Sequence, residues 1–149
     1  MKINENRSVR ELRKEAILET FFKTMKRLSE NNPFVTYKEV IEKAVKESAP
    51  RFFVNFESAR RLISLMARKK KLPMINKNKL EMYKEIYRRY VNSQKDGAGK
   101  YKSLETILSE PAPSFYVDTS TFQGLVYRTL RERCYYNNFI NTLNTGVVS

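Results

Sequence analysis

The chain has 149 residues, a length that suits one compact domain or two very small ones sharing a core. Its 29 Lys and Arg residues outnumber 16 Asp and Glu residues, so the formal net charge is +13, which attracts polyanions such as nucleic acid, an anionic membrane surface or an acidic protein. Because histidine is absent and Cys134 is the only cysteine, the composition excludes His-dependent catalysis and any internal disulfide.

Nothing in the sequence has the composition of a membrane span or a secretion signal. No run of about eighteen apolar residues occurs. The N-terminal stretch MKINENRSVRELRKE also lacks an apolar core. Cys134 is expected to lie in a buried neighbourhood as a packing thiol. We expect no membrane association, and a location in the cytoplasm or in a particle assembled there.

The predicted elements begin with a helix over about residues 12–28. Its apolar residues recur at spacings of three and four, the period of a helix with one buried face. A polar loop over 29–36 follows. A second helix is predicted from Tyr37 to Glu47, because Pro50 disfavours the helical conformation in the residue before it. The connector RFFV at 51–54 is predicted to be extended, as a short strand or as irregular chain.

A third helix is predicted after Asn55, whose side chain suits an N-cap. Its expected buried residues are Ala59, Leu62, Ile63 and Met66. The link 71–78 contains Pro73 and separates this set of helices from the next. The same order then repeats, with a helix over about 80–91, a loop over 93–100, a helix from Tyr101 to Ser109, the connector SFYV at 114–117 and the N-cap Asp118. The last helix is expected to bury Phe122, Leu125, Val126 and Leu130.

The two sets look like copies of one unit. Residues 41–70 align without a gap on residues 104–133, at a constant offset of 63. The identical pairs are Glu42/Glu105, Glu47/Glu110, Ala49/Ala112, Pro50/Pro113, Phe52/Phe115, Val54/Val117, Leu62/Leu125 and Arg68/Arg131. We therefore predict an all-α protein, a tandem duplication of a three-helix unit. Residues 1–72 and 73–136 form the two units, and 137–149 form a polar tail that is frayed or docked on a partner.

Each predicted unit is similar to a helix-turn-helix module in having three short helices with a basic third helix. The connector between the second and third helices is about eight residues long, whereas the standard turn has three or four. A three-helix fold with an unusual corner is therefore a better description than a true helix-turn-helix.

No motif supports catalysis, a metal or a cofactor. The only two Asp residues are Asp96 and Asp118, whereas a metal-dependent nuclease needs several converging carboxylates. Gly99-Lys100 resembles the end of a phosphate-binding loop, but the earlier glycine is missing and Tyr101 replaces the magnesium-binding hydroxyl residue. We predict a protein that is not an enzyme and that holds no metal or cofactor.

Basic residues on three helices are the candidate nucleic-acid ligands. They belong to the first helix of copy one and to the third helix of each copy, where Lys and Arg can contact phosphates. The candidates are Arg10, Arg13, Lys14, Arg60, Arg61, Arg68, Lys69, Lys70, Lys71, Arg128, Arg131 and Arg133. Aromatic residues near the C-terminus are candidate anchors for a protein partner, namely Tyr135, Tyr136 and Phe139.

The doubled motif, SAPRFFV and then PAPSFYV with KLEMYKEIYRRY between them, resembles a family of small proteins that recur in Bacteroidetes genomes among phage and mobile-element genes. The resemblance covers roughly residues 10–133, and the paired Ala-Pro-x-aromatic-aromatic-Val motif is its most specific part. It implies a genomic setting, and a location in the host cytoplasm or the virion. It implies no activity and no site residues.

Two functions fit these observations. The first is a phage or mobile-element protein that binds DNA through phosphate contacts from Lys and Arg. The alternative is a structural virion protein, such as an auxiliary capsid or connector component, that docks on acidic shell proteins or on packaged genome. A small enzyme is a distant third, and assembly into a homo-oligomer stays open.

Overall fold

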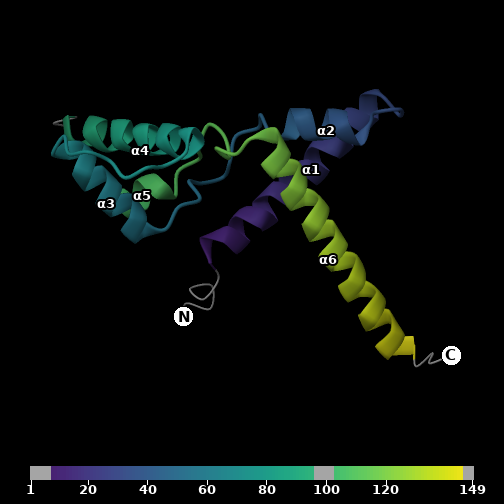
Figure 1. Cartoon of the computed structure of the whole chain (residues 1–149). Helices are drawn as coiled ribbons and strands as arrows, with labels where there is room; N and C mark the ends of the chain where they lie inside the picture. The colour runs from purple at the N-terminus through teal and green to yellow at the C-terminus, as the bar shows by residue number, and fades with distance from the viewer. Residues whose placement is uncertain (1–7, 96–102, 146–149) are drawn as a thin grey trace.

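The computed structural model describes residues 8–95 and 103–145, and the side chains of residues 8–94 and 103–134. The described chain folds into six helices and no strand, so the all-α prediction is confirmed (Figure 1). The helices are α1 (Val9–Asn31), α2 (Tyr37–Ala44), α3 (Phe56–Ala67), α4 (Lys77–Lys95), α5 (Leu104–Leu108) and α6 (Thr119–Thr145). The second helices end earlier than predicted, and Tyr101 lies outside the described residues.

Side-chain caps set the start of the third helix in each predicted unit. Asn55 Oδ1 accepts a hydrogen bond from the Ser58 N–H at 2.7 Å, and Asp118 Oδ1 accepts one from the Thr121 N–H at 2.7 Å. Such a cap satisfies one of the backbone donors that a helix start leaves without an intrahelical partner, and it stabilises the fold by about 1 kcal/mol. Both N-caps predicted from the sequence are therefore confirmed.

The two predicted units exchange their third helices, so that each third helix packs against the first two helices of the other unit. In one bundle, α1 packs against α2 and α6; in the other, α4 packs against α3 and α5. We call these the first bundle (α1, α2 and the start of α6) and the second bundle (α3, α4 and α5); Figure 1 shows them as two arms joined at the centre. The helices of the units predicted at 1–72 and 73–136 therefore do not pack separately, because each third helix buries its apolar face against the other unit. In the described chain α2 does not pack against α3 and α5 does not pack against α6, so neither unit forms a contiguous helix-turn-helix.

The two connectors cross at the centre of the molecule. Ala49 and Ala112 form an isolated antiparallel bridge, in place of the short strands considered from the sequence. Next to the bridge, the rings of Phe53 and Phe115 stack at 6.0 Å between centroids. The equivalent pair under the offset of 63, Tyr116 and Phe52, stacks at 6.3 Å. Both connectors therefore contribute their aromatic residues to a core that continues from one bundle into the other.

The third helices bury the predicted apolar faces. In α3 the buried apolar residues are Ala59, Leu62 and Ile63, and in α6 they are Phe122, Leu125 and Val126. Met66 and Leu130 are only partly buried at the edge of the core. Helix α6 continues through 27 residues, about 40 Å, and its C-terminal half projects away from the first bundle (Figure 1). The segment from Asn137 to Thr145, predicted as a polar tail, is therefore helical.

Candidate nucleic-acid interface

Positive charge is concentrated between the first connector and the start of α4. Residues 51–79 include nine Lys or Arg residues and a single acidic residue, Glu57, so this segment has a net charge of +8 out of +13 for the whole chain. Residues 9–47, which span α1 and α2, have nine basic and seven acidic residues. The second bundle and its link are therefore the most positive part of the molecule.

Ion pairs neutralise much of the charge on the first bundle. Arg133 on α6 contacts Glu15 on α1 at 2.6 Å, Arg27 contacts Glu47 at 2.7 Å, and Lys23 contacts Glu19 at 3.0 Å. Lys14 and Arg133 line a hollow together with three glutamates, Glu11, Glu15 and Glu132. Lys14 and Arg133 were predicted to contact nucleic acid, but a phosphate approaching them would meet this acidic surface.

The strongest unneutralised cluster is Arg68, Lys69, Lys70 and Lys71, which we call the basic run. All four side chains are exposed, and no carboxylate in the described residues lies within ion-pair distance of them. The run follows the C-terminal end of α3, where the helix dipole favours cations. A phosphate backbone would therefore meet four adjacent cations without first displacing an acidic side chain.

The backbone at the end of α3 fixes the direction of the basic run. The Lys69 N–H donates to the Met66 carbonyl at 3.1 Å, and the Lys70 N–H donates to the Leu65 carbonyl at 2.9 Å. This is the Schellman motif, in which the residue after the C-cap takes a left-handed conformation. Lys69 has a φ of 54°, so the chain reverses there, and the next two lysines leave the helix along a defined path.

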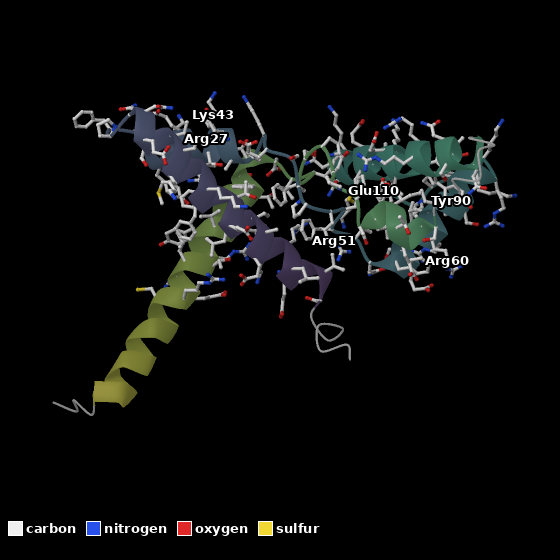
Figure 2. The ribbon with its side chains drawn as sticks, turned by 180° about the vertical axis from the view of Figure 1, so that it is seen from behind. Arg27, Lys43, Arg51, Arg60, Tyr90 and Glu110 are labelled. Atoms are coloured by element: carbon white, nitrogen blue, oxygen red, sulfur yellow. The ribbon has the colours of Figure 1, made fainter. Side chains whose placement is uncertain are left out.

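Arg60 and Arg61 lie on the exposed surface of α3. Arg60 contacts Glu57 at 2.9 Å, an exposed pair that solvent screens, whereas no described carboxylate pairs with Arg61. Figure 2 shows Arg60 on the arm opposite the one that carries Arg27 and Lys43. The predicted α3 cations therefore share one bundle, while those on α1 and α6 belong to the other.

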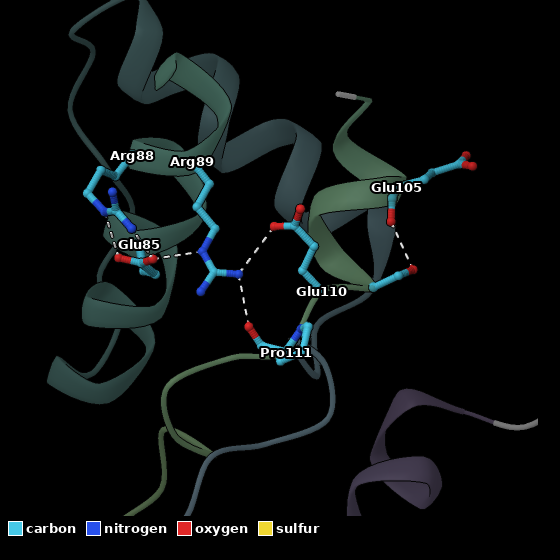
Figure 3. A network of polar contacts seen from close by, with 7 residues as sticks. Glu85, Arg88, Arg89, Glu105, Glu110 and Pro111 are labelled. Carbon is cyan, nitrogen blue, oxygen red and sulfur yellow. Dashed lines mark hydrogen bonds and ion pairs between the residues drawn. The ribbon is translucent and has the colours of Figure 1, made fainter. Parts of the chain in front are cut away.

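Two arginines of α4 have a structural role. The Glu85 carboxylate contacts Arg88 at 2.6 Å and Arg89 at 2.7 Å (Figure 3). Arg89 also donates to the Pro111 carbonyl at 2.9 Å, and its guanidinium lies 4.9 Å from the centre of the Phe52 ring. These contacts connect α4 to both connectors. Hydrogen bonds from Arg88, opposed by partial burial, hold the pKa of Glu85 below its usual value.

Lys77 and Lys79, at the start of α4, are candidate phosphate ligands that the sequence analysis missed. They line a hollow at the junction of the two bundles together with Arg13 of α1. Their signal in the sequence was the high density of basic residues that continues past Lys71 as far as Lys79. The described structure therefore adds a basic surface at the junction, and it places the predicted Arg10 and Arg13 there.

Two sequence predictions concern the end of α6. Cys134 is exposed, so it is not the buried packing thiol that was expected. Arg128 and Arg131 are also exposed on this helix. The proposed anchors Tyr135, Tyr136 and Phe139 lie on the helical backbone of α6, but their side chains are outside the described residues.

The described side chains form no cluster of three or more His, Cys, Asp or Glu residues that could hold a metal ion. Among the described residues, none of the helices combines the length and the apolar composition that a membrane span requires. No protein-family model matches the chain, and no curated protein or solved structure shows significant similarity to it.

Proposed function

We propose that the chain is a non-catalytic nucleic-acid-binding protein of a phage or mobile element, and that it binds the DNA backbone through the basic run and Arg61. The observation that carries the proposal is the uneven distribution of charge. Residues 51–79 have a net charge of +8, and the basic run within them meets no described carboxylate.

Phosphate contacts explain such a surface better than contacts with bases. Lysine is a flexible point charge that suits a phosphate, whereas the major-groove contacts that read bases are mostly bidentate contacts from Arg, Asn or Gln. The basic run contains three lysines and lies beyond the end of α3. Binding should therefore be largely independent of sequence and should weaken steeply with salt.

The test is binding of a labelled random-sequence duplex across a salt series from about 50 to 200 mM. We expect replacement of Lys69, Lys70 and Lys71 with Gln to reduce the slope of log affinity against log salt by about 2.7, because each phosphate contact contributes about 0.9. The matched control replaces three exposed lysines in and just after α2, Lys38, Lys43 and Lys46, with Gln. Equal losses in the two variants would contradict the proposed interface.

A virion structural protein is the second candidate function, and two exposed apolar side chains favour it. Met74 is fully exposed in the link beside the basic run, and Phe34 is 85% exposed at the loop between α1 and α2. An acidic shell protein could contact both charge and apolar surface. Such binding would persist at high salt where duplex binding fails, and replacing Met74 and Phe34 with Ser would weaken it without changing duplex affinity.

A further inference from the structure

Two adjoining hollows lie at the junction of the bundles, with volumes of about 430 and about 280 Å³. They share four lining residues, Arg13, Phe53, Lys79 and Met82. We call the pair the junction groove. Its walls come from α1, α3, α4, α6 and both connectors, so it exists only when the two bundles are assembled.

Most of the charged residues that line the junction groove are cations. Arg10, Arg13, Lys77 and Lys79 line it, and none of them forms an ion pair with a described carboxylate. Arg13 is half-buried, and its Nε atom is buried without a hydrogen-bond partner in the described structure. Burial, and to a lesser extent Arg10, lower the pKa of Arg13. A buried guanidinium donor left without an acceptor is costly, and a bound anion would remove that cost.

The backbone reinforces this positive charge. Four helices begin at the junction groove, because its lining includes the first residues of α1, the N-cap Asn55 of α3, Asn76 before α4, and the N-cap Asp118 of α6. Asn76 Oδ1 accepts from the Lys79 N–H at 2.8 Å, so it caps α4 in the same way. Each helix start has a partial positive charge, which adds to the charge of the four cations.

Asp118 is the one acidic residue in the lining of the junction groove. Its Oδ1 atom accepts hydrogen bonds from the Ser120 hydroxyl at 3.1 Å and from the Thr121 N–H at 2.7 Å. The carboxylate is therefore occupied by its own helix start, and four cations outnumber it. Both hollows are also large enough for a group the size of phosphate, which has a few heavy atoms.

We propose that the junction groove binds a phosphate group, held by Arg10, Arg13, Lys77 and Lys79. This site is separate from the basic run and does not depend on duplex binding there. The phosphate has two sources with the same chemistry: a free phosphate or phosphomonoester such as a mononucleotide, or a backbone phosphate of a nucleic acid that continues from the second bundle.

The test is titration of the full chain with inorganic phosphate, followed by amide chemical shifts in two-dimensional NMR spectra. We expect saturable shifts at the helix starts around Arg10, Ser58, Lys79 and Thr121. The variant Lys77→Gln/Lys79→Gln, which removes two of the proposed ligands, should bind phosphate at least about tenfold more weakly, since the loss of one charge-assisted hydrogen bond already has about that effect. The matched control Lys43→Gln/Lys46→Gln, which removes the same charge at and just beyond the C-terminal end of α2, should bind as the natural chain does.

Absence of saturable shifts at these helix starts, or equal affinity in the two variants, would overturn the proposal. Since Lys77 and Lys79 are exposed, a well-dispersed spectrum confirms that their variant is folded. Competition then identifies the source of the phosphate. If the natural ligand is a nucleic-acid backbone, a random duplex displaces inorganic phosphate from the groove. If the natural ligand is a phosphomonoester, a mononucleotide displaces it and the duplex does not. Duplex binding in a chain that shows no phosphate-induced shifts at the groove contradicts this site alone, and phosphate binding at the groove without duplex binding contradicts the proposed function alone.

Discussion

Ala49 and Ala112 exchange both of their main-chain hydrogen bonds, each with an N···O distance of 2.9 Å. These are identical residues paired by the sequence alignment, so each position meets its own counterpart. Contacts of this isologous kind are typical of a two-fold relation. Here the relation lies within one chain, and it explains why the two aromatic stacks beside the bridge are also equivalent.

The first prediction concerns this crossing point. Ala112 is 1% exposed, so Ala112→Leu should force side chains apart and lower the free energy of unfolding by about 1–3 kcal/mol. Urea denaturation followed by circular dichroism measures the change. Ala67→Leu, on the exposed surface of α3, is the control and should change stability by less than about 0.5 kcal/mol. Similar stability in both variants would mean that the crossing is loosely packed.

The second prediction compares two arginines that contact equivalent glutamates. Arg89 contacts Glu110, Glu85 and Pro111 with its side chain 23% exposed, whereas Arg27 contacts Glu47 with its side chain 58% exposed. Arg89→Met should lower the free energy of unfolding by about 2–4 kcal/mol, because it removes a charged partner from two partly buried carboxylates and the donor to the Pro111 carbonyl. Arg27→Met should cost less than about 1 kcal/mol. Equal costs would contradict a structural role for the Arg89 network.

The third prediction is a pH dependence that comes from Glu85. Its pKa is lowered in the folded chain, mainly by hydrogen bonds from Arg88, so the stabilisation is present above the pKa of an unfolded Glu and is lost as the pH falls through the lower, folded value. The stability difference between the natural chain and Glu85→Gln should therefore be largest above about pH 5 and shrink below it. Denaturation at several pH values between about 3 and 7 measures it.

A matched control for the pH experiment is Glu57→Gln, which breaks an exposed pair with Arg60. Its stability difference from the natural chain should stay below about 1 kcal/mol throughout. A Glu85→Gln difference that grows as the pH falls would have the wrong sign and would exclude an ionised Glu85 as the stabilising form.

The fourth prediction uses the left-handed residue at the end of α3. Lys69 has a φ of 54°, a conformation that is unfavourable for a side chain with a Cβ atom. Lys69→Gly should therefore raise the free energy of unfolding by about 1 kcal/mol. The neighbouring substitution Lys70→Gly removes the same charge from a residue without positive φ, and it should be neutral or destabilising. A thermal shift assay distinguishes the two.

The fifth prediction compares how much the cations of the two basic third helices contribute to duplex affinity. Arg128→Gln/Arg131→Gln on α6 should leave duplex affinity nearly unchanged, because the first bundle has little net charge. Arg68→Gln/Lys70→Gln in the basic run removes the same charge and should weaken binding clearly at low salt. Fluorescence anisotropy with one labelled duplex compares them. If the α6 variant binds as weakly as the basic-run variant, the interface extends over both bundles.

Local features of the fold were predictable from the sequence because they depend on neighbouring residues. Apolar residues at spacings of three and four indicated the helices, and the short polar side chains of Asn55 and Asp118 indicated where two of them begin. The exposed basic run was also predictable, because four consecutive charged residues cannot all be buried.

The exchange of third helices was not predictable from the sequence. Leu62 and Ile63 on α3 match Leu125 and Val126 on α6 in position and nearly in volume, so either helix could fill either bundle. The choice depends on how the connectors cross, which only the assembled aromatic core determines. The same exchange places Arg133 beside Glu15, although the two residues are 118 positions apart in the sequence. The ion pairs that neutralise charge on the first bundle were therefore not predictable either.

The exchange also has a consequence for synthesis on the ribosome. Helices α1 and α2 pack against α6, whose sequence emerges only after the whole second bundle. At a synthesis rate of about 5–20 residues per second, the apolar face of the first two helices would stay exposed for roughly 5–20 seconds before α6 can pack against it. During that interval Ile17, Leu18 and Phe21, all buried in the finished fold, remain available to chaperones or to other nascent chains.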